Sequence, residues 1–152
     1  MAYEIELKDV PAQLALTVRK RVTMTTIAPA MGEAFGAIMA HVEAGSSQFA
    51  GPPFCLYPEP PGDDFAIVLC VPVAPGAKAG EGVELEEIPG GTVAATLHKG
   101  PYSSMEETYR AMEVWMTANG RRPAGPPREV YLNDPMSVPE SELLTEVDWP
   151  VA

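Results

Sequence analysis

The same ordered set of short sequence pieces occurs twice in this chain of 152 residues, which constrains the fold more than any other feature. Residues 51–60 have the sequence GPPFCLYPEP and residues 125–134 have GPPREVYLND, offset by 74 positions. Three further echoes are each offset by 78 positions, at residues 5–7 and 83–85, 10–11 and 88–89, and 71–73 and 149–151. Ordered echoes of this kind predict a duplicated module of roughly 75 residues.

Each half of the chain shows the same order of expected elements. Strands are indicated by alternation or by β-branched and apolar runs, and they are expected at residues 3–10, 14–24, 54–58 and 65–73, then at 83–88, 92–98, 128–133 and 143–149. One helix is expected after Thr26. The other is expected from Ser103, where Ser103 and Glu106 fit a capping box, to Asn119 and Gly120.

The expected fold is a single α+β domain over residues 1–152. Module 1 would cover residues 1–76 and module 2 residues 80–152, each with the order β-β-α-β-β. The first two strands of each module are expected to form a hairpin. Antiparallel sheets with one long helix per module would then be related by an approximate two-fold axis, with a ligand cleft between the modules.

Composition excludes several classes of function. The net charge of −11 argues against nucleic acid and anionic membrane surfaces as partners. No apolar run approaches the ~20 residues that span a bilayer, and the N-terminus lacks the features of a signal peptide, so a cytoplasmic location is expected. Two cysteines and two histidines show no metal-ligand spacing, and neither a metal nor a cofactor is expected.

The two Gly-Pro-Pro strands suggest a site, because alternate side chains of a strand share a face. Val130 and Leu132 are expected to face the helix of their module. Four side chains are then expected on the faces away from the helices, lining the cleft: Cys55, Tyr57, Glu129 and Tyr131. The alternative is a solvated polar face, which periodicity alone does not distinguish from a pocket.

Four pieces of the chain resemble the GyrI-like small-molecule-binding domains. They are residues 129–135 (EVYLNDP), 144–151 (LTEVDWPV), 98–102 (HKGPY) and 51–57 (GPPFCLY). The resemblance implies the duplicated α+β fold, found alone or as the effector-binding domain of bacterial MerR- and AraC-type multidrug regulators. It also implies that Glu129 lies at the floor of an aromatic pocket for lipophilic, often cationic compounds.

One strand departs from the family pattern. Residues 65–73 (FAIVLCVPV) are entirely apolar, whereas members of that family often carry an acidic residue before Val-Pro-Val. Val68 or Cys70 is therefore expected where polarity is usual, and Glu129 is the only carboxylate expected in the cleft. The expected ligand contacts are Glu129, Tyr131, Tyr57, Cys55, Val68, Cys70, Tyr102 at the rim and Trp149 in the closing strand.

Three functions are compatible with these residues. The first is binding, sensing or sequestration of a lipophilic small molecule, with cation–π contacts from the tyrosines. The second is a hydrolase that opens reactive cyclopropane-type toxins with Glu129 and Tyr131, since the resemblance includes such enzymes. The third, and least favoured, is a protein inhibitor of DNA gyrase. The choice between binding and turnover stays open, as does the existence of a protein partner.

Overall fold

The computed structural model describes residues 3–45, 48–60, 62–134 and 137–152. Its chain divides into two compact units. Unit 1 contains the residues up to Val10 together with Gly91–Ala152, and unit 2 is Pro11–Gly90. Pro61 and Pro135, the latter from the motif at 129–135, lie outside the described residues.

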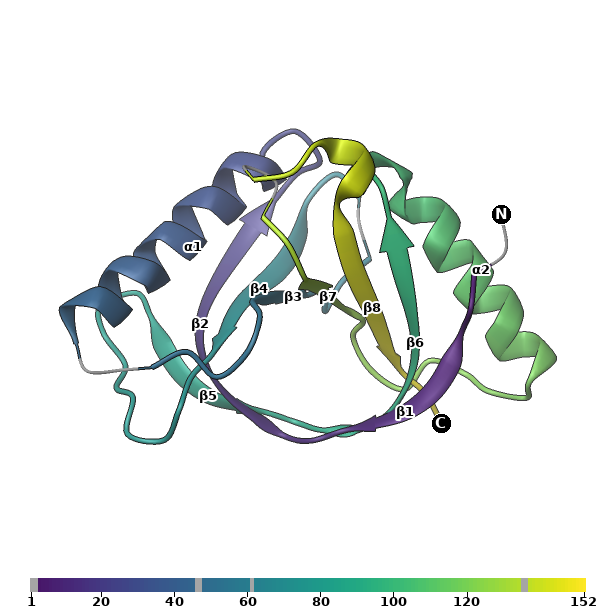
Figure 1. Ribbon diagram of the computed structural model, residues 1–152, viewed down its shortest axis with the longest axis horizontal. Coiled ribbons are helices and arrows are strands. Elements are labelled where there is room, and N and C mark those ends of the chain that lie inside the picture. The colour runs from purple at the N-terminus through teal and green to yellow at the C-terminus, as the bar shows by residue number, and fades with distance from the viewer. Residues whose placement is uncertain (1–2, 46–47, 61, 135–136) are drawn as a thin grey trace. The chain divides into compact units, whose positions relative to one another are not determined.

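Unit 1 is an antiparallel sheet covered on one face by a helix (Figure 1). The strand order is β1-β6-β8-β7. The elements are β1 (Glu6–Val10), β6 (Gly91–Lys99), the short 3-10 helix η1 (Tyr102–Ser104), α2 (Met105–Ala118), β7 (Arg128–Tyr131), η2 (Glu140–Glu142) and β8 (Leu144–Pro150).

Unit 2 is built from the same kinds of element. Its antiparallel strand order is β3-β4-β2-β5, and α1 packs against β2 and β4. The elements are β2 (Gln13–Val22), α1 (Ile27–Ala44), β3 (Phe54–Leu56), β4 (Phe65–Pro72) and β5 (Glu84–Ile88). The ion pair between Lys20 of β2 and Glu33 of α1 shows which face of β2 the helix covers.

The predicted mixture of antiparallel strands with one long helix in each half is confirmed, but the predicted hairpins are wrong. Strand β1 pairs with β6 rather than β2, and β5 pairs with β2 rather than β6. Each unit thus takes one edge strand from the other half of the sequence, so the unit boundaries differ from those of the predicted modules. Alternation along a strand specifies its faces, but not its partner.

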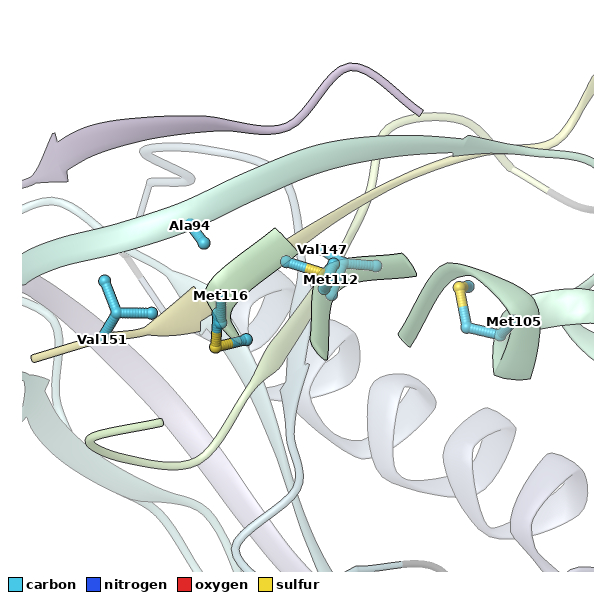
Figure 2. Close-up of a cluster of buried hydrophobic side chains, with 6 residues drawn as sticks. All are labelled: Ala94, Met105, Met112, Met116, Val147 and Val151. Atoms are coloured by element: carbon cyan, nitrogen blue, oxygen red, sulfur yellow. The ribbon is translucent and has the colours of Figure 1, made fainter. Parts of the chain in front are cut away.

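The core of unit 1 lies between α2 and its sheet. Figure 2 shows the buried methionines of α2 together with Ala94 of β6, Val147 of β8 and Val151 just after β8. Its members are Ala94, Met105, Met112, Met116, Val147 and Val151. Each buried methionine side chain of this core contributes roughly 1.5–3 kcal/mol.

The two ends of α2 compare differently with the sequence prediction. Gly120 ends the helix with φ +67°, a left-handed conformation that favours glycine, as predicted. At the other end, the capping box of Ser103 and Glu106 does not form. The helix begins at Met105, and the hydroxyl group of Ser104 bonds to the preceding turn instead.

No helix in the described ranges combines the length and the apolar character needed to cross a membrane.

Candidate functional site

Glu129 faces helix α2, contrary to the prediction. Glu129 of β7 stands opposite Val147 of β8, and directly opposed residues of an antiparallel pair project from the same face. Val147 belongs to the core beneath α2. The predicted pairing of Glu129 with Tyr131 on one face is confirmed, but their placement on the face away from the helix is wrong. Alternation groups the side chains without saying which group meets the helix.

Two phenol groups hold the carboxylate of Glu129. The Tyr109 hydroxyl, from α2, donates a 2.8 Å hydrogen bond to Oε2. The Tyr131 hydroxyl, two residues along the strand, donates a 3.2 Å hydrogen bond to Oε1. Both oxygens accept, which is the pattern of an ionised carboxylate. Glu129 itself is 8% exposed.

Two further aromatic contacts extend this group. The ring of Tyr102 meets the ring of Tyr131 edge-on, with centroids 5.7 Å apart. The ring of Tyr109 meets Trp149 in the same manner at 5.6 Å. Such edge-to-face pairs add about 0.5–1.5 kcal/mol beyond burial. We call Glu129, Tyr102, Tyr109, Tyr131 and Trp149 the aromatic–carboxylate cluster.

Tyr102 is the most exposed ring of this cluster. It is 40% exposed, whereas the other three rings are half-buried. Partial burial, together with the negative charges of Glu129 and Asp134, raises the pKa of Tyr102 above its usual value, because each disfavours the phenolate. Tyr102 therefore stays a neutral phenol at physiological pH and offers an uncharged aromatic face.

The sequence interpretation missed Tyr109. Tyr109 lies at helical spacing between Met105 and Met112, a pattern that indicates packing in the core rather than a site. The signal that could have identified Tyr109 is its hydroxyl group within an otherwise apolar stripe, since a buried phenol needs a hydrogen-bond partner. The partner could not be named without knowing that Glu129 faces the helix.

The predicted contacts from unit 2 are distributed over both faces of its sheet. Cys55 stands opposite Leu69, whereas Cys70 stands opposite Phe54, so the two cysteines project from opposite faces. Both are fully buried thiols. Val68 is on the face of Cys70, and Tyr57 is half-buried just beyond β3. These four residues therefore do not share one face of unit 2, as the predicted cleft wall required.

Unit 1 buries a second carboxyl group on the face of its sheet opposite to α2. Asp148 is 3% exposed and neighbours Glu146, which accepts a 2.7 Å hydrogen bond from Lys8. Burial and, after it, the adjacent Glu146 raise the pKa of Asp148 to about 7, although Lys8 and Arg128 act in the opposite direction. Glu129 is thus not the only buried acid of the β7–β8 pair.

Two surface depressions are lined by residues outside the cluster. One depression of about 210 Å³ is lined by Arg19, Lys20, Arg21, Pro58, Ala66, Ile67 and Val68 of unit 2. Another, of about 510 Å³, lies on α2 at Glu113, Val114, Thr117 and Ala118. Within the described ranges, no group of three His, Cys, Asp or Glu side chains is arranged to hold a metal ion.

The pattern of a carboxylate held by tyrosines agrees with the family resemblance. A family model for the GyrI-like small molecule binding domain matches residues 3–152. The chain belongs to this family. Among curated proteins, no relative was found.

Solved structures with this GyrI-like fold include domains of larger proteins. The crystal structure of the EcmrR C-terminal domain has a TM-score of 0.84 and 24% identity, with 100% of this chain and 99% of that chain covered. EcmrR in a cryo-EM complex with DNA has a TM-score of 0.87 and 23% identity, with 98% of this chain covered. The chain spans 57% of that EcmrR chain.

Two other structures were solved as proteins of similar length. SAV2435 bound to tetraphenylphosphonium has a TM-score of 0.69 and 12% identity, with 100% of this chain and 94% of that chain covered. A hydrolase encoded by lin2189 from Listeria innocua has a TM-score of 0.66 and 16% identity, with 98% and 92% covered. At these identities the likeness establishes the shared fold.

Proposed function

We propose that the chain binds lipophilic aromatic cations at the aromatic–carboxylate cluster. The observation that carries the proposal is Glu129, a buried carboxylate hydrogen-bonded by Tyr109 and Tyr131. A negative charge surrounded by aromatic faces attracts a cation, and each cation–π contact contributes roughly 0.5–2 kcal/mol. The tetraphenylphosphonium bound to the fold neighbour SAV2435 is a ligand of this chemistry.

The cluster also accounts for selectivity between ligands. Phenol hydroxyl groups orient the carboxylate without adding positive charge, so the cluster retains net negative charge. A ligand of the same shape without charge gains the aromatic contacts, but not the Coulomb attraction to Glu129. Preference for the cation over a neutral analogue is therefore the property that distinguishes this proposal from general binding of apolar molecules.

The test compares two ligands and two variants. Tetraphenylphosphonium and the uncharged triphenylphosphine oxide are titrated into wild-type protein, Glu129→Gln and Glu140→Gln. Glu140 is an exposed residue of η2 and provides a control with the same change of charge. We expect Glu129→Gln to weaken binding of the cation about tenfold or more and to leave the neutral ligand little changed. Equal losses for both ligands would show that Glu129 acts as a structural residue.

The predicted contribution of unit 2 belongs to the same proposal. Tyr57 occupies the position in its Gly-Pro-Pro strand that Tyr131 occupies in the other, and we propose that it also contributes to ligand binding. Cys55, Val68 and Cys70 stay predicted contacts. The structure favours them less than Tyr57, because their side chains are divided between the two faces of the unit 2 sheet. The duplicated origin of the two halves is supported by the ordered echoes in the sequence. It is also supported by the strand orders, because equivalent strands follow one another in the same order in both units.

Hydrolysis is the second candidate, and a specific contact favours it. Glu129 is hydrogen-bonded to the hydroxyl group of Tyr131, so a base for water and a donor for an electrophile lie side by side. The substrate would be a strained, electrophilic ring. One water adds, so that its oxygen bonds to a ring carbon, one ring carbon–carbon bond breaks, and the proton of the water ends on the released carbon.

The experiment for turnover is incubation with a cyclopropane-bearing electrophile, followed by mass spectrometry. A product heavier by one water that disappears with Glu129→Gln would support catalysis. Tight binding with the compound returned unchanged after long incubation would leave only the binding proposal.

A further inference from the structure

A buried histidine anchors the turn that carries Tyr102. His98, near the end of β6, is 2% exposed and lies beneath the start of α2. Its Nε2 lies 3.0 Å from the carbonyl oxygen of Pro101, and its Nδ1 lies 2.6 Å from the hydroxyl oxygen of Thr108. His98 therefore connects the strand, the turn and the first part of the helix.

The contact with Pro101 determines which atom donates at Nε2 of the imidazole. A carbonyl oxygen only accepts hydrogen bonds, so Nε2 must carry the proton that it donates to Pro101. Nδ1 shares a hydrogen bond with the hydroxyl group of Thr108, which is fully buried. Both ring nitrogens are satisfied in this arrangement, and the plane of the ring is defined on both sides.

Three donors converge on the carbonyl oxygen of Pro101. Besides His98 Nε2, the backbone N–H of Ser104 lies 3.2 Å from this oxygen and the Ser104 hydroxyl oxygen lies 2.9 Å from it. The oxygen belongs to the peptide group that joins Pro101 to Tyr102, so these bonds set the orientation of that peptide plane. Gly100, at φ +125°, provides the bend that leads into the turn.

The anchored turn faces the aromatic–carboxylate cluster. His98 and Tyr131 both stand opposite Thr145 of β8, one on each neighbouring strand, so their side chains are on the same face of the sheet. Tyr102 leaves the turn and meets Tyr131 edge-on, with centroids 5.7 Å apart. Tyr131 in turn donates its hydrogen bond to Glu129. A contiguous set of contacts thus runs from His98 to the carboxylate.

We propose that His98 is a positioning residue that holds Tyr102 against Tyr131. The effect of His98 on the position of the Tyr102 ring concerns the ligand-free protein and does not depend on the proposed function. Its consequence for affinity rests on the proposed function, because the outermost ring of the cluster contributes to cation binding only if the cluster is the binding site. Removing His98 therefore acts on the ligand through Tyr102, without any contact between His98 and the ligand.

The first measurement needs no ligand. Nuclear Overhauser effects between the ring protons of Tyr102 and Tyr131 are compared in wild-type protein, His98→Leu, His98→Gln and Thr108→Val. We expect the effect to disappear in His98→Leu. In His98→Gln it should be largely retained, because the amide N–H can still donate to Pro101. Thr108→Val is the matched control, since it removes the contact at Nδ1 and leaves the three donors to the Pro101 carbonyl in place.

The second measurement is a double-mutant cycle on tetraphenylphosphonium affinity. His98→Leu should weaken binding about three- to tenfold, which lies within the range that one aromatic contact contributes. In the background of Tyr102→Ala it should weaken binding no further, because the ring through which His98 acts is absent. Equal losses in both backgrounds would indicate general destabilisation and would overturn the positioning role.

The outcomes separate the two proposals. If wild-type protein binds no cation, the proposed function fails, and the ring contacts alone decide the inference. If the Tyr102–Tyr131 contact survives in His98→Leu, the inference fails even though cation binding stands. Should His98→Leu not fold, the comparison of His98→Gln with Thr108→Val decides: loss of the ring contact in Thr108→Val but not in His98→Gln contradicts the role of the Pro101 carbonyl.

Discussion

The hydroxyl group of Tyr109 donates a 2.8 Å hydrogen bond to Oε2 of Glu129 and thereby joins helix α2 to strand β7. This contact places the carboxylate beneath the helix, within the core of unit 1 and beside its aromatic rings. A buried charged acceptor is costly to leave without its donors. The contact therefore contributes to the stability of unit 1 as well as to the geometry of the cluster.

Tyr109→Phe is expected to lower the free energy of unfolding by about 1–3 kcal/mol, because it removes a donor from a buried charged group. Tyr131→Phe should cost less, since its hydrogen bond is longer at 3.2 Å and the ring stays in place. Urea denaturation followed by tryptophan fluorescence measures both. A larger effect of Tyr131→Phe would contradict the ranking.

Tyr131→Ala and Tyr57→Ala are both expected to weaken binding of a lipophilic cation while leaving the circular dichroism spectrum unchanged. Each removes an aromatic face, and a loss of about three- to tenfold is expected for each contact. Isothermal titration with tetraphenylphosphonium measures the affinity. Val114→Ala, on the exposed face of α2, is the control for a lost apolar side chain. An effect of Tyr131→Ala alone would contradict a role of Tyr57 in binding.

Asp148 is expected to make stability fall as pH rises from about 4 to about 7. Its pKa is raised from the ordinary value of 3.8 to about 7 in the folded chain. Between these pH values the folded state therefore keeps a proton that the unfolded state releases. The stability contributed by protonated Asp148 is fully present below about pH 4 and is lost above about pH 7. The slope approaches at most ~1.4 kcal/mol per pH unit.

Asp148→Asn removes this dependence and is expected to be more stable than wild-type protein at pH 8. Unfolding by urea at pH 5 and pH 8 measures the difference for both proteins. An unchanged pH dependence in Asp148→Asn would assign the slope to another group.

Thr145→Val is expected to increase stability. Thr145 is fully buried, and its hydroxyl oxygen has no hydrogen-bond partner within the described part of the protein. Replacing an unsatisfied buried hydroxyl by a methyl group of the same shape removes a desolvation cost of about 1–3 kcal/mol. Thr96→Val is the matched control, because the Thr96 hydroxyl donates a 2.8 Å hydrogen bond to the carbonyl oxygen of Glu4. Thermal unfolding should move the two variants in opposite directions.

Local chemistry allowed much of the fold to be predicted from the sequence. Alternation identified the strands to within a few residues, and Asn119 with Gly120 identified the end of α2. The spacing of Glu129 and Tyr131, two residues apart on a strand, placed them on one face. These features depend on neighbours along the chain, and so a single sequence contains them.

Contacts between distant segments were decided only by the tertiary structure. The sequence does not say that β1 pairs with β6, that α2 covers the face of Glu129, or that Tyr109 completes the cluster. Pairing and face depend on which arrangement buries the most apolar surface while satisfying the buried polar groups. Val147 packs beneath α2 with Met112. Because Glu129 and Val147 share a face of the sheet, this packing turns Glu129 toward Tyr109.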